Sequence, residues 1–301
     1  LKINAQTVPP IAATQDWVKI RSDQLRPRNG VYEVAITAQL WETHFIDEVK
    51  MIAIDHPKGT EIFVDERFVA PVPPAYQLYA YAELHSPVAA TDHNNRNILD
   101  IIQDRDGDRL GGFAKGRYQG IAENHFVELA LGQIDASSEI HIVASGWIRP
   151  TDTSINVASS QGDHSPPKAL RVEIATSDGG WKTVIANAGF PSGKLKTIVL
   201  EIPANTIDPS DPRIRISTNL EIYWDQIRFA LASQDVQCKE VPIELLQADL
   251  GYMGYPTMSR SNPDAPNIPD YSDIRHGNAW RDLEGYYTRY GAVEELLSGV
   301  D

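Results

Sequence analysis

The stretch "EIYWDQIRFA", residues 221–230, decides the fold. An aspartate beside a tryptophan is compatible with a catalytic carboxylate, a sugar-binding pair or the plain end of a strand. Most residues of the stretch are β-formers. On an extended chain Ile222 and Trp224 share one face, while Tyr223 and Asp225 share the other. The alternation therefore predicts a strand in which Trp224 anchors a hydrophobic core and Asp225 emerges on the opposite side.

Similar strand patterns, separated by turn residues, occupy much of the chain. The preceding "RIRISTN" (213–219) is expected to be the neighbouring strand, and "SINVASS" (154–160) a further one. In "VYEVAITAQL" (31–40) every second residue is apolar, which predicts a strand with one buried side. "ATSDGGWKTV" (175–184) predicts a hairpin, because its Asp-Gly-Gly supplies positive-φ positions for the turn.

These patterns predict an all-β protein with two β-sandwich domains and a tail. The first sandwich is expected over residues 1–120, with a long polar connection at 92–120 that includes a short helix in "NILDIIQD" (97–104). The second, at residues 121–235, is expected to be jelly-roll-like. Residues 236–301 are predicted to be a Tyr- and Pro-rich irregular tail that wraps over a partner surface and ends in a short helix.

Composition and charge exclude several classes of partner. The chain has 301 residues, 42% of them hydrophobic and 23% charged, which is typical of a globular protein. Its formal net charge of −14, without a basic run, argues against binding to nucleic acid or to anionic membrane surfaces. No apolar run reaches the length of a membrane span, so an integral membrane protein is not expected.

The single cysteine, Cys238, excludes an internal disulfide and a zinc site built from cysteines. A single cysteine is compatible with a protein of a reducing compartment and equally with an exported protein that has a large core. The sequence begins at Leu1 rather than at a methionine, and we interpret it as a processed or truncated chain.

Three segments resemble a known family. They are "WETHFIDEVKMIAIDHPKGTEIFVDERF" (41–68), "RIRISTNLEIYWDQIRFA" (213–230) and "HGNAWRDLEGYYTRYGAVEELL" (276–297). Together they resemble the region that follows the propeller or helical-repeat modules of large bacterial FG-GAP and ASPIC/UnbV-type proteins, the relatives of cartilage acidic protein. The resemblance implies an exported, periplasmic or extracellular, bacterial protein. It implies no established activity for this region, and the propeller loops that bind calcium in the family have no run of counterparts here.

Residues 126–230 separately resemble a galactose-binding-like, discoidin-type jelly roll. "HFVELALG" (125–132) resembles its first core strand and "ALRVEIATSDGGWKTV" (169–184) its central hairpin. That superfamily often binds sugars or other proteins through loops at one end, which is what the resemblance implies for this chain.

Two groups of residues are candidate metal ligands. The turn "DRDGD" places Asp104, Asp106 and Asp108 at alternate positions, so that three carboxylates could surround one Ca²⁺ ion. No glutamate follows at the spacing of an EF-hand, and a solvated acidic turn is the competing interpretation. Glu42 and His44 would share one face of a strand, but two ligands are too few for a metal site.

Aromatic residues are the candidate binding residues. Trp181 follows the predicted hairpin turn and is the candidate sugar platform, although tryptophan more often anchors a core. Tyrosine gives a large contact area at low entropic cost, so the tail tyrosines suit a protein partner. They are Tyr252, Tyr255, Tyr271, Tyr286, Tyr287 and Tyr290.

The sequence therefore predicts a non-catalytic recognition module that assembles with a neighbouring domain or subunit. No cofactor is expected, other than Ca²⁺ if the Asp104–Asp108 turn binds a metal. The alternative is a carbohydrate-binding module that uses loops of the second sandwich. A hydrolase, catalytic or accessory, is the third class, but the chain has no G-x-S-x-G motif that would indicate a serine nucleophile.

Overall fold

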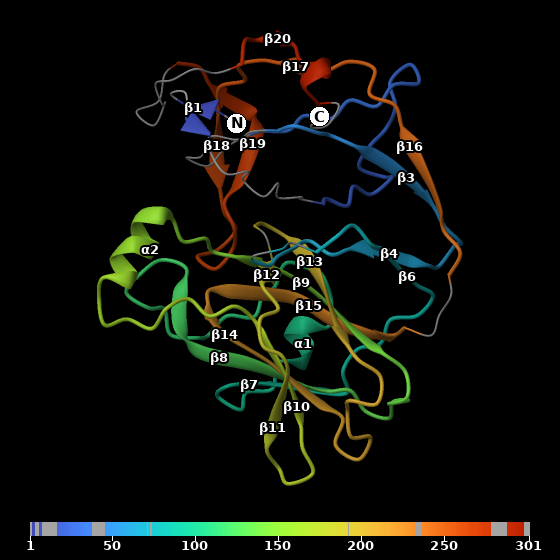
Figure 1. The fold of residues 1–301 in the computed structure, drawn as a ribbon, viewed down its shortest axis with the longest axis vertical. Helices are drawn as coiled ribbons and strands as arrows, with labels where there is room; N and C mark the ends of the chain where they lie inside the picture. Colours follow the sequence, from blue (N-terminus) through green and yellow to red (C-terminus); the bar gives the residue numbers. More distant parts are fainter. Residues whose placement is uncertain are drawn as a thin grey trace. The chain divides into compact units, whose positions relative to one another are not determined.

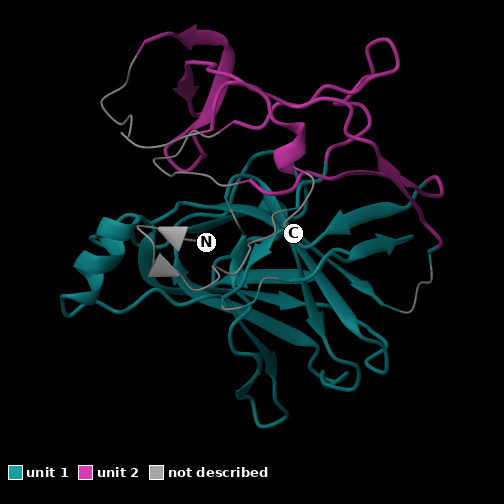
Figure 2. Cartoon of the chain, turned by 45° about the horizontal axis from the view of Figure 1, so that its top comes forward, with its two compact units in different colours: residues 1–19, 59–236 teal, residues 20–58, 237–301 magenta. Residues whose placement is uncertain are grey.

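A computed structural model describes residues 17–37, 46–70, 72, 74–191, 193–232, 236–277 and 288–297, together with the backbone of the short strands β1 (Lys2–Ile3) and β2 (Gln6–Thr7). Strands far outnumber helices in these ranges, so the predicted all-β class is confirmed (Figure 1). The chain divides into two compact units (Figure 2). Unit 1 comprises residues 1–19 and 59–236, and unit 2 comprises residues 20–58 and 237–301. These units differ from the ranges expected from the sequence, since each combines two separate segments.

Two antiparallel sheets of three or more strands lie in the described part of unit 1. One has the strand order β11-β10-β14-β8-β7, and the other has the order β13-β9-β15. The first is built from β7 (Ala89–Asp92), β8 (Ile121–Ala130), β10 (Arg171–Ala175), β11 (Trp181–Ile185) and β14 (Arg213–Leu220). The second is built from β9 (Ile140–Ile148), β13 (Lys196–Ile202) and β15 (Ile222–Leu231).

One hydrophobic core lies between these two sheets, as in a β-sandwich. It takes Leu129 from β8 and Ile216 from β14 on one side, and Ile142, Ile198 and Trp224 from the second sheet on the other. Trp224 is therefore a core residue, as predicted. The jelly-roll topology stays a prediction.

The strand β15 corrects two expectations about "EIYWDQIRFA". First, β14 is not its neighbour: β14 pairs with β8 and β10, whereas β15 pairs with β9 in the other sheet. The chain crosses from one sheet to the other at Glu221. Second, Asp225 does not emerge into solvent but is buried, with Tyr223, because the second face of β15 is covered as well.

A further layer covers part of the outer face of the three-stranded sheet. The strands β4 (Glu61–Val64) and β6 (Leu78–Tyr81) form an antiparallel ribbon. Phe63, Tyr79 and Tyr81 of this ribbon pack with Val143 of β9 and Val199 of β13. Because both faces of the sheet are covered, β9 is buried along its whole length. The short strands β5 (Arg67–Phe68) and β12 (Phe190–Pro191) pair with each other beside it.

The described part of unit 1 contains two helices. The predicted short helix within 97–104 is present as α1 (Leu99–Ile102), and it adds Ile102 to the core. The predicted strand at 154–160 is wrong, since these residues belong to the helix α2 (Thr153–Ser160). Asp152 caps this helix: its carboxylate accepts a hydrogen bond of 2.8 Å from the amide of Ile155, which satisfies one of the amides left open at a helix start. The predicted hairpin at 175–184 is confirmed by the pairing of β10 with β11.

Unit 2 is built from two-stranded ribbons. β3 (Met51–Asp55) pairs with β16 (Lys239–Ile243), β17 (Asp249–Leu250) with β20 (Gly291–Ala292), and β18 (Tyr255–Ser259) with β19 (Ile268–Arg275). A 3₁₀ helix, η1 (Glu294–Leu297), lies where a short terminal helix was predicted. The strand predicted at 31–40 is wrong for its described part, because residues 32–37 are irregular and residues 32–36 are exposed.

Replacing Trp224 by alanine is expected to destabilise unit 1 by about 3–5 kcal/mol, the usual loss for a large buried aromatic side chain. Trp224 is only 3% exposed and lies between the sheets. Urea unfolding followed by far-ultraviolet circular dichroism measures the loss. The control is Val157→Ala on the surface of α2, where the side chain is 48% exposed and a change within about 0.5 kcal/mol is expected. Equal midpoints for the two variants would contradict the core position of Trp224.

Candidate recognition surface

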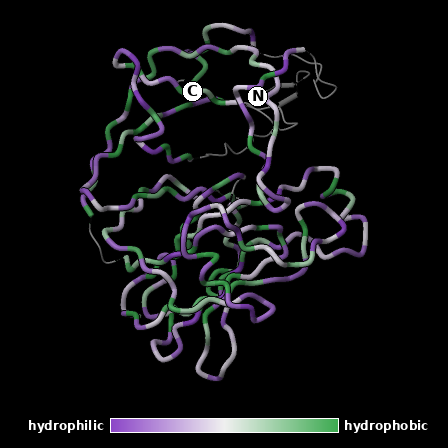
Figure 3. Tube along the Cα trace, turned by 180° about the vertical axis from the view of Figure 1, so that it is seen from behind, coloured by the Kyte–Doolittle hydropathy of each residue, from purple (hydrophilic) through white to green (hydrophobic). Residues whose placement is uncertain are grey.

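In the described part of unit 2, many hydrophobic side chains are exposed and almost none is fully buried. Every buried hydrophobic residue in the described part of the chain belongs to unit 1, with the exception of Ala265. Figure 3 shows that hydrophobic residues recur along both units, so unit 2 does not lack them. We call the exposed large hydrophobic residues of unit 2 the apolar surface. They are Ile20, Val31, Tyr32, Val34, Ile36, Ile46, Val241, Leu245, Leu246, Leu250, Tyr252, Met258, Ile268, Tyr271, Tyr290 and Leu296.

Four of the six predicted tyrosines lie in the described part of unit 2. Tyr252 is 49% exposed, Tyr271 48% and Tyr290 69%, whereas Tyr255 is half-buried. Tyr286 and Tyr287, also predicted to bind a partner, lie outside the described residues.

The hairpin of β18 and β19 positions two of these tyrosines. The hydroxyl of Tyr252 donates a hydrogen bond of 2.5 Å to the carbonyl of Gly277 and accepts one of 3.1 Å from its amide. The ring of Tyr252 also meets that of Tyr255 edge-on, with centroids 6.3 Å apart. The Tyr271 hydroxyl lies 2.8 Å from that of Thr37. These contacts fix the phenol ends of Tyr252 and Tyr271 while their rings stay about half exposed, as in a contact surface.

Three residues of the apolar surface flank the ribbon of β17 and β20. The amide of Val293 donates to the carbonyl of Ala248 at 2.8 Å, which extends this ribbon toward η1. Leu246, Tyr290 and Leu296 are 66%, 69% and 57% exposed. Because Asp249 pairs with Ala292 and Leu250 with Gly291, Leu246 and Leu296 lie toward one end of the ribbon and Tyr290 toward the other. Exposed large apolar side chains along one ribbon are compatible with a surface that another surface covers.

The predicted calcium ligands do not converge. Asp104, Asp106 and Asp108 are exposed, and the three carboxylates do not form one of the groups whose ligand atoms lie within 4.8 Å. The carboxylate of Asp106 instead accepts a hydrogen bond of 2.9 Å from the amide of Asp108. Calcium binding at this turn stays a prediction.

The same turn explains the burial of Asp225. The amide of Gly107 donates to Asp225 Oδ1 at 2.9 Å, and Arg109 Nη2 lies 4.0 Å from Asp225 Oδ2. Gly107 has a φ of +91°, a conformation that other residues seldom adopt. Asp225 therefore holds the turn against β15, and this is the structural role of the Trp-Asp pair.

Trp181, the predicted sugar platform, packs against its own sheet. The guanidinium carbon of Arg215 lies 4.0 Å from the indole centroid, and that of Arg213 lies 5.4 Å from it. Arg215 also lies 3.9 Å from the ring centroid of Phe126 and pairs with Glu128 at 2.9 Å. These are cation–π distances, and at least one face of the indole is occupied within unit 1. A glycan contact at Trp181 stays a prediction.

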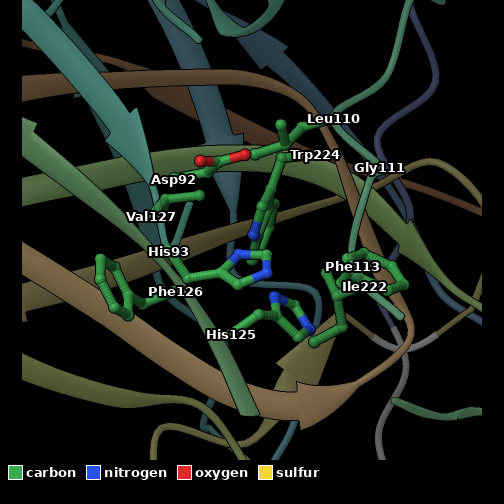
Figure 4. Close-up of a pocket in the computed structure, with 10 residues that line it drawn as sticks. All are labelled: Asp92, His93, Leu110, Gly111, Phe113, His125, Phe126, Val127, Ile222 and Trp224. Atoms are coloured by element: carbon green, nitrogen blue, oxygen red, sulfur yellow. The ribbon is translucent and has the colours of Figure 1, made fainter. Parts of the chain in front are cut away.

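A small cavity of unit 1 gathers histidine and aromatic side chains, drawn in Figure 4. Its volume is about 10 Å³, which is room for about one water molecule. The rings of His93 and His125 are 5.9 Å apart, and His125 stacks on Phe113 at 4.4 Å. The Nε2–H group of His125 donates to the carbonyl of Leu220 at 2.9 Å. Burial lowers the pKa of His125 below its ordinary value of 6.5. The cavity therefore suits a packed histidine better than a ligand.

The remaining candidates are placed as follows. Glu42 and His44 lie outside the described residues, and Cys238 is half-buried in unit 2.

The structure also gathers a group that the sequence analysis missed: Glu139, His141 and Glu201 bring their ligand atoms within 4.8 Å of one another. The alternation in "EIH" could have suggested a shared face for Glu139 and His141, but Glu201 joins them only through the pairing of β9 with β13.

Comparisons with known proteins identify no relative. No family model matches the chain, and neither a curated protein nor a solved structure matches it. Within the ranges that the structure describes, no helix combines the length and apolar character needed to cross a membrane.

Acidification is expected to destabilise unit 1 through His125. Because the folded pKa of His125 is lowered, the unfolded chain binds its proton more readily as the pH falls below about 6.5. Unfolding free energy should therefore decrease between about pH 7 and pH 5. His125→Gln keeps a donor for Leu220 and should make this dependence shallower, as measured by urea midpoints across that range. His164→Gln, at an exposed histidine of unit 1, is the control and should leave the slope unchanged. Identical slopes for all three proteins would exclude His125 as the source.

Proposed function

We propose that this chain is a non-catalytic recognition module that binds another protein through the apolar surface of unit 2. The observation that supports the proposal is the contrast between the units. Unit 1 has an extensive core between two sheets, whereas the described part of unit 2 contributes only Ala265 to the buried hydrophobic residues. Two-stranded ribbons without a core are marginally stable in water, so a covering surface would stabilise unit 2.

The free energy gained when a partner covers the apolar surface favours this role. Covering an exposed aliphatic or aromatic side chain completely contributes about 1.5–3 kcal/mol. Leu246, Tyr290 and Leu296 alone offer three such side chains, and the rest of the apolar surface offers more. Association opposes this gain with roughly 4–15 kcal/mol of lost translational and rotational freedom. A protein partner that covers several of these residues together would exceed that opposing term, whereas a small ligand on one residue would not.

Unit 1 serves as the scaffold in this proposal. The carbohydrate alternative depends on Trp181, and the indole of that residue already packs against Arg215. The exposed tyrosines of unit 2 offer large contact areas with part of their entropy already lost, since Tyr252 and Tyr271 are held by their hydroxyl groups. The resemblance of residues 41–68, 213–230 and 276–297 to exported bacterial proteins supports a partner outside the cytoplasm.

Site-specific photocrosslinking in the cells that make the protein tests the proposal. A benzophenone amino acid in place of Tyr290 should yield one discrete covalent adduct with a protein, which is either another polypeptide or a second copy of this chain. Leu246→Ser combined with Leu296→Ser should reduce the adduct about tenfold or more, because truncation of a hot-spot anchor costs about 2 kcal/mol or more and about 1.4 kcal/mol is a tenfold change in affinity.

The matched control carries the crosslinker in place of Val157, which is also exposed but lies on α2 of unit 1. It should give no adduct of that mass. Adducts of equal yield at Val157 and Tyr290, or no protein adduct at Tyr290, would contradict the assignment of the partner surface to unit 2.

A further inference from the structure

We propose that Glu139, His141 and Glu201 of unit 1 form a binding site for a divalent transition-metal ion of the zinc class. This inference is independent of the proposed function, because all three residues belong to unit 1.

The pairing of β9 with β13 brings the three side chains to one face. Glu201 is the direct cross-strand partner of His141, so their side chains point to the same side of the sheet. Glu139 precedes β9 and lies two residues before His141, which places it on that side as well. The three ligand atoms, one imidazole nitrogen and two carboxylate oxygens, all lie within 4.8 Å of one another.

The imidazole is buried between the acids. The side chain of His141 is only 9% exposed, and its Nε2 atom lies 2.6 Å from Glu139 Oε1. A hydrogen-bonded histidine would need only Glu139 on that nitrogen. Glu201 is a second carboxylate whose oxygen lies within 4.8 Å of the other two ligand atoms, which a hydrogen-bonding role for His141 does not require but a metal site does.

Two tyrosines of β6 orient the ligands His141 and Glu201 through hydrogen bonds. The hydroxyl of Tyr79 donates to Glu201 Oε1 at 2.8 Å, and the hydroxyl of Tyr81 lies 2.7 Å from His141 Nδ1. A hydroxyl can accept a hydrogen bond as well as donate one. Tyr81 can therefore accept from Nδ1–H, which leaves the lone pair of Nε2 for a metal, as outer-shell partners of metal-bound histidines commonly do.

The ligand types select the metal. Imidazole with two carboxylates suits zinc and its neighbours in the first transition series, whereas calcium takes oxygen ligands only. Glu139 is partly exposed and Glu201 is exposed, so an ion has a route of entry and keeps room for water as a further ligand. Binding requires the tautomer of His141 that carries its proton on Nδ1, so that Nε2 faces the metal.

The test uses the full chain, stripped with a chelator and dialysed against zinc chloride. We expect one zinc ion per chain in equilibrium dialysis with elemental analysis, and a higher melting midpoint with zinc than without it. Excess calcium chloride should not displace the zinc ion, because calcium takes oxygen ligands only. Tyr81→Phe removes an outer-shell partner and should weaken zinc binding by about 10–100-fold.

Glu201→Gln is the decisive variant, because the amide oxygen can still accept from Tyr79 and the fold should be kept. It should lose at least as much zinc affinity as Tyr81→Phe, and His141→Gln should lose saturable binding. Glu123→Gln is the matched control, since Glu123 faces His93 at 3.2 Å without a second carboxylate, and it should bind zinc as the original chain does. No saturable zinc binding by the original chain, or unchanged binding by Glu201→Gln, would overturn the proposal.

Discussion

The burial of β9 on both faces is the constraint on which the rest of unit 1 depends. All residues from Ile140 to Ile148 are buried, and β9 pairs with β13 along one edge and with β15 along the other. Its inner face meets the five-stranded sheet through the core. Its outer face carries polar side chains, which have no water to bind and must find partners in the protein. Ser145 does so with Thr197, at 2.8 Å, and His141 does so with Tyr81 and Glu139.

The edge of the three-stranded sheet is closed by side chains instead of a strand. The amide of Thr197 donates to Glu66 Oε2 at 2.7 Å, and that of Val199 donates to Asp65 Oδ1 at 3.3 Å. Both acids lie between β4 and β5, so the segment that covers the outer face also covers the edge. Burial raises the pKa of Asp65, while Arg67, at 2.6 Å, opposes the rise. An open sheet edge is a template for pairing with another chain. The carboxylates of Glu66 and Asp65 occupy two amides of β13 and so block such pairing at this edge.

The residues that could be predicted from the sequence are those whose environment depends on local pattern. Trp224 in the core and the hairpin around Gly179 follow from alternation and turn chemistry. Asp225 could not be predicted, because alternation separates two faces but does not reveal that a turn from residues 104–109 covers the second one. The helix α2 was missed because Ile155 and Val157 occupy alternate positions in "SINVASS", as in a strand, whereas the cap at Asp152 favours a helix.

The candidate sites show the same limit. The exposure of Tyr252, Tyr271 and Tyr290 agrees with what tyrosine-rich composition suggests, but the cluster around His141 depends on strand register over some sixty residues, which one sequence does not reveal. To predict that Trp181 packs on Arg215, one would also have to know the order of β11, β10 and β14 in the sheet. Local patterns thus indicate which residues are aromatic or acidic, and the pairing of distant strands decides which of them meet.

Residues 31–37 of unit 2 show an apolar alternation that no core covers within the described part of that unit. Tyr32, Val34 and Ile36 alternate with polar neighbours as in a half-buried strand, yet they are 42%, 52% and 62% exposed. Alternation of this kind has a physical reason only where something covers the apolar side. In unit 1 that cover comes from the opposite sheet or from the ribbon of β4 and β6. In the proposed function a partner protein supplies it for unit 2, so the sequence pattern belongs to the bound state and not to a core within the unit itself.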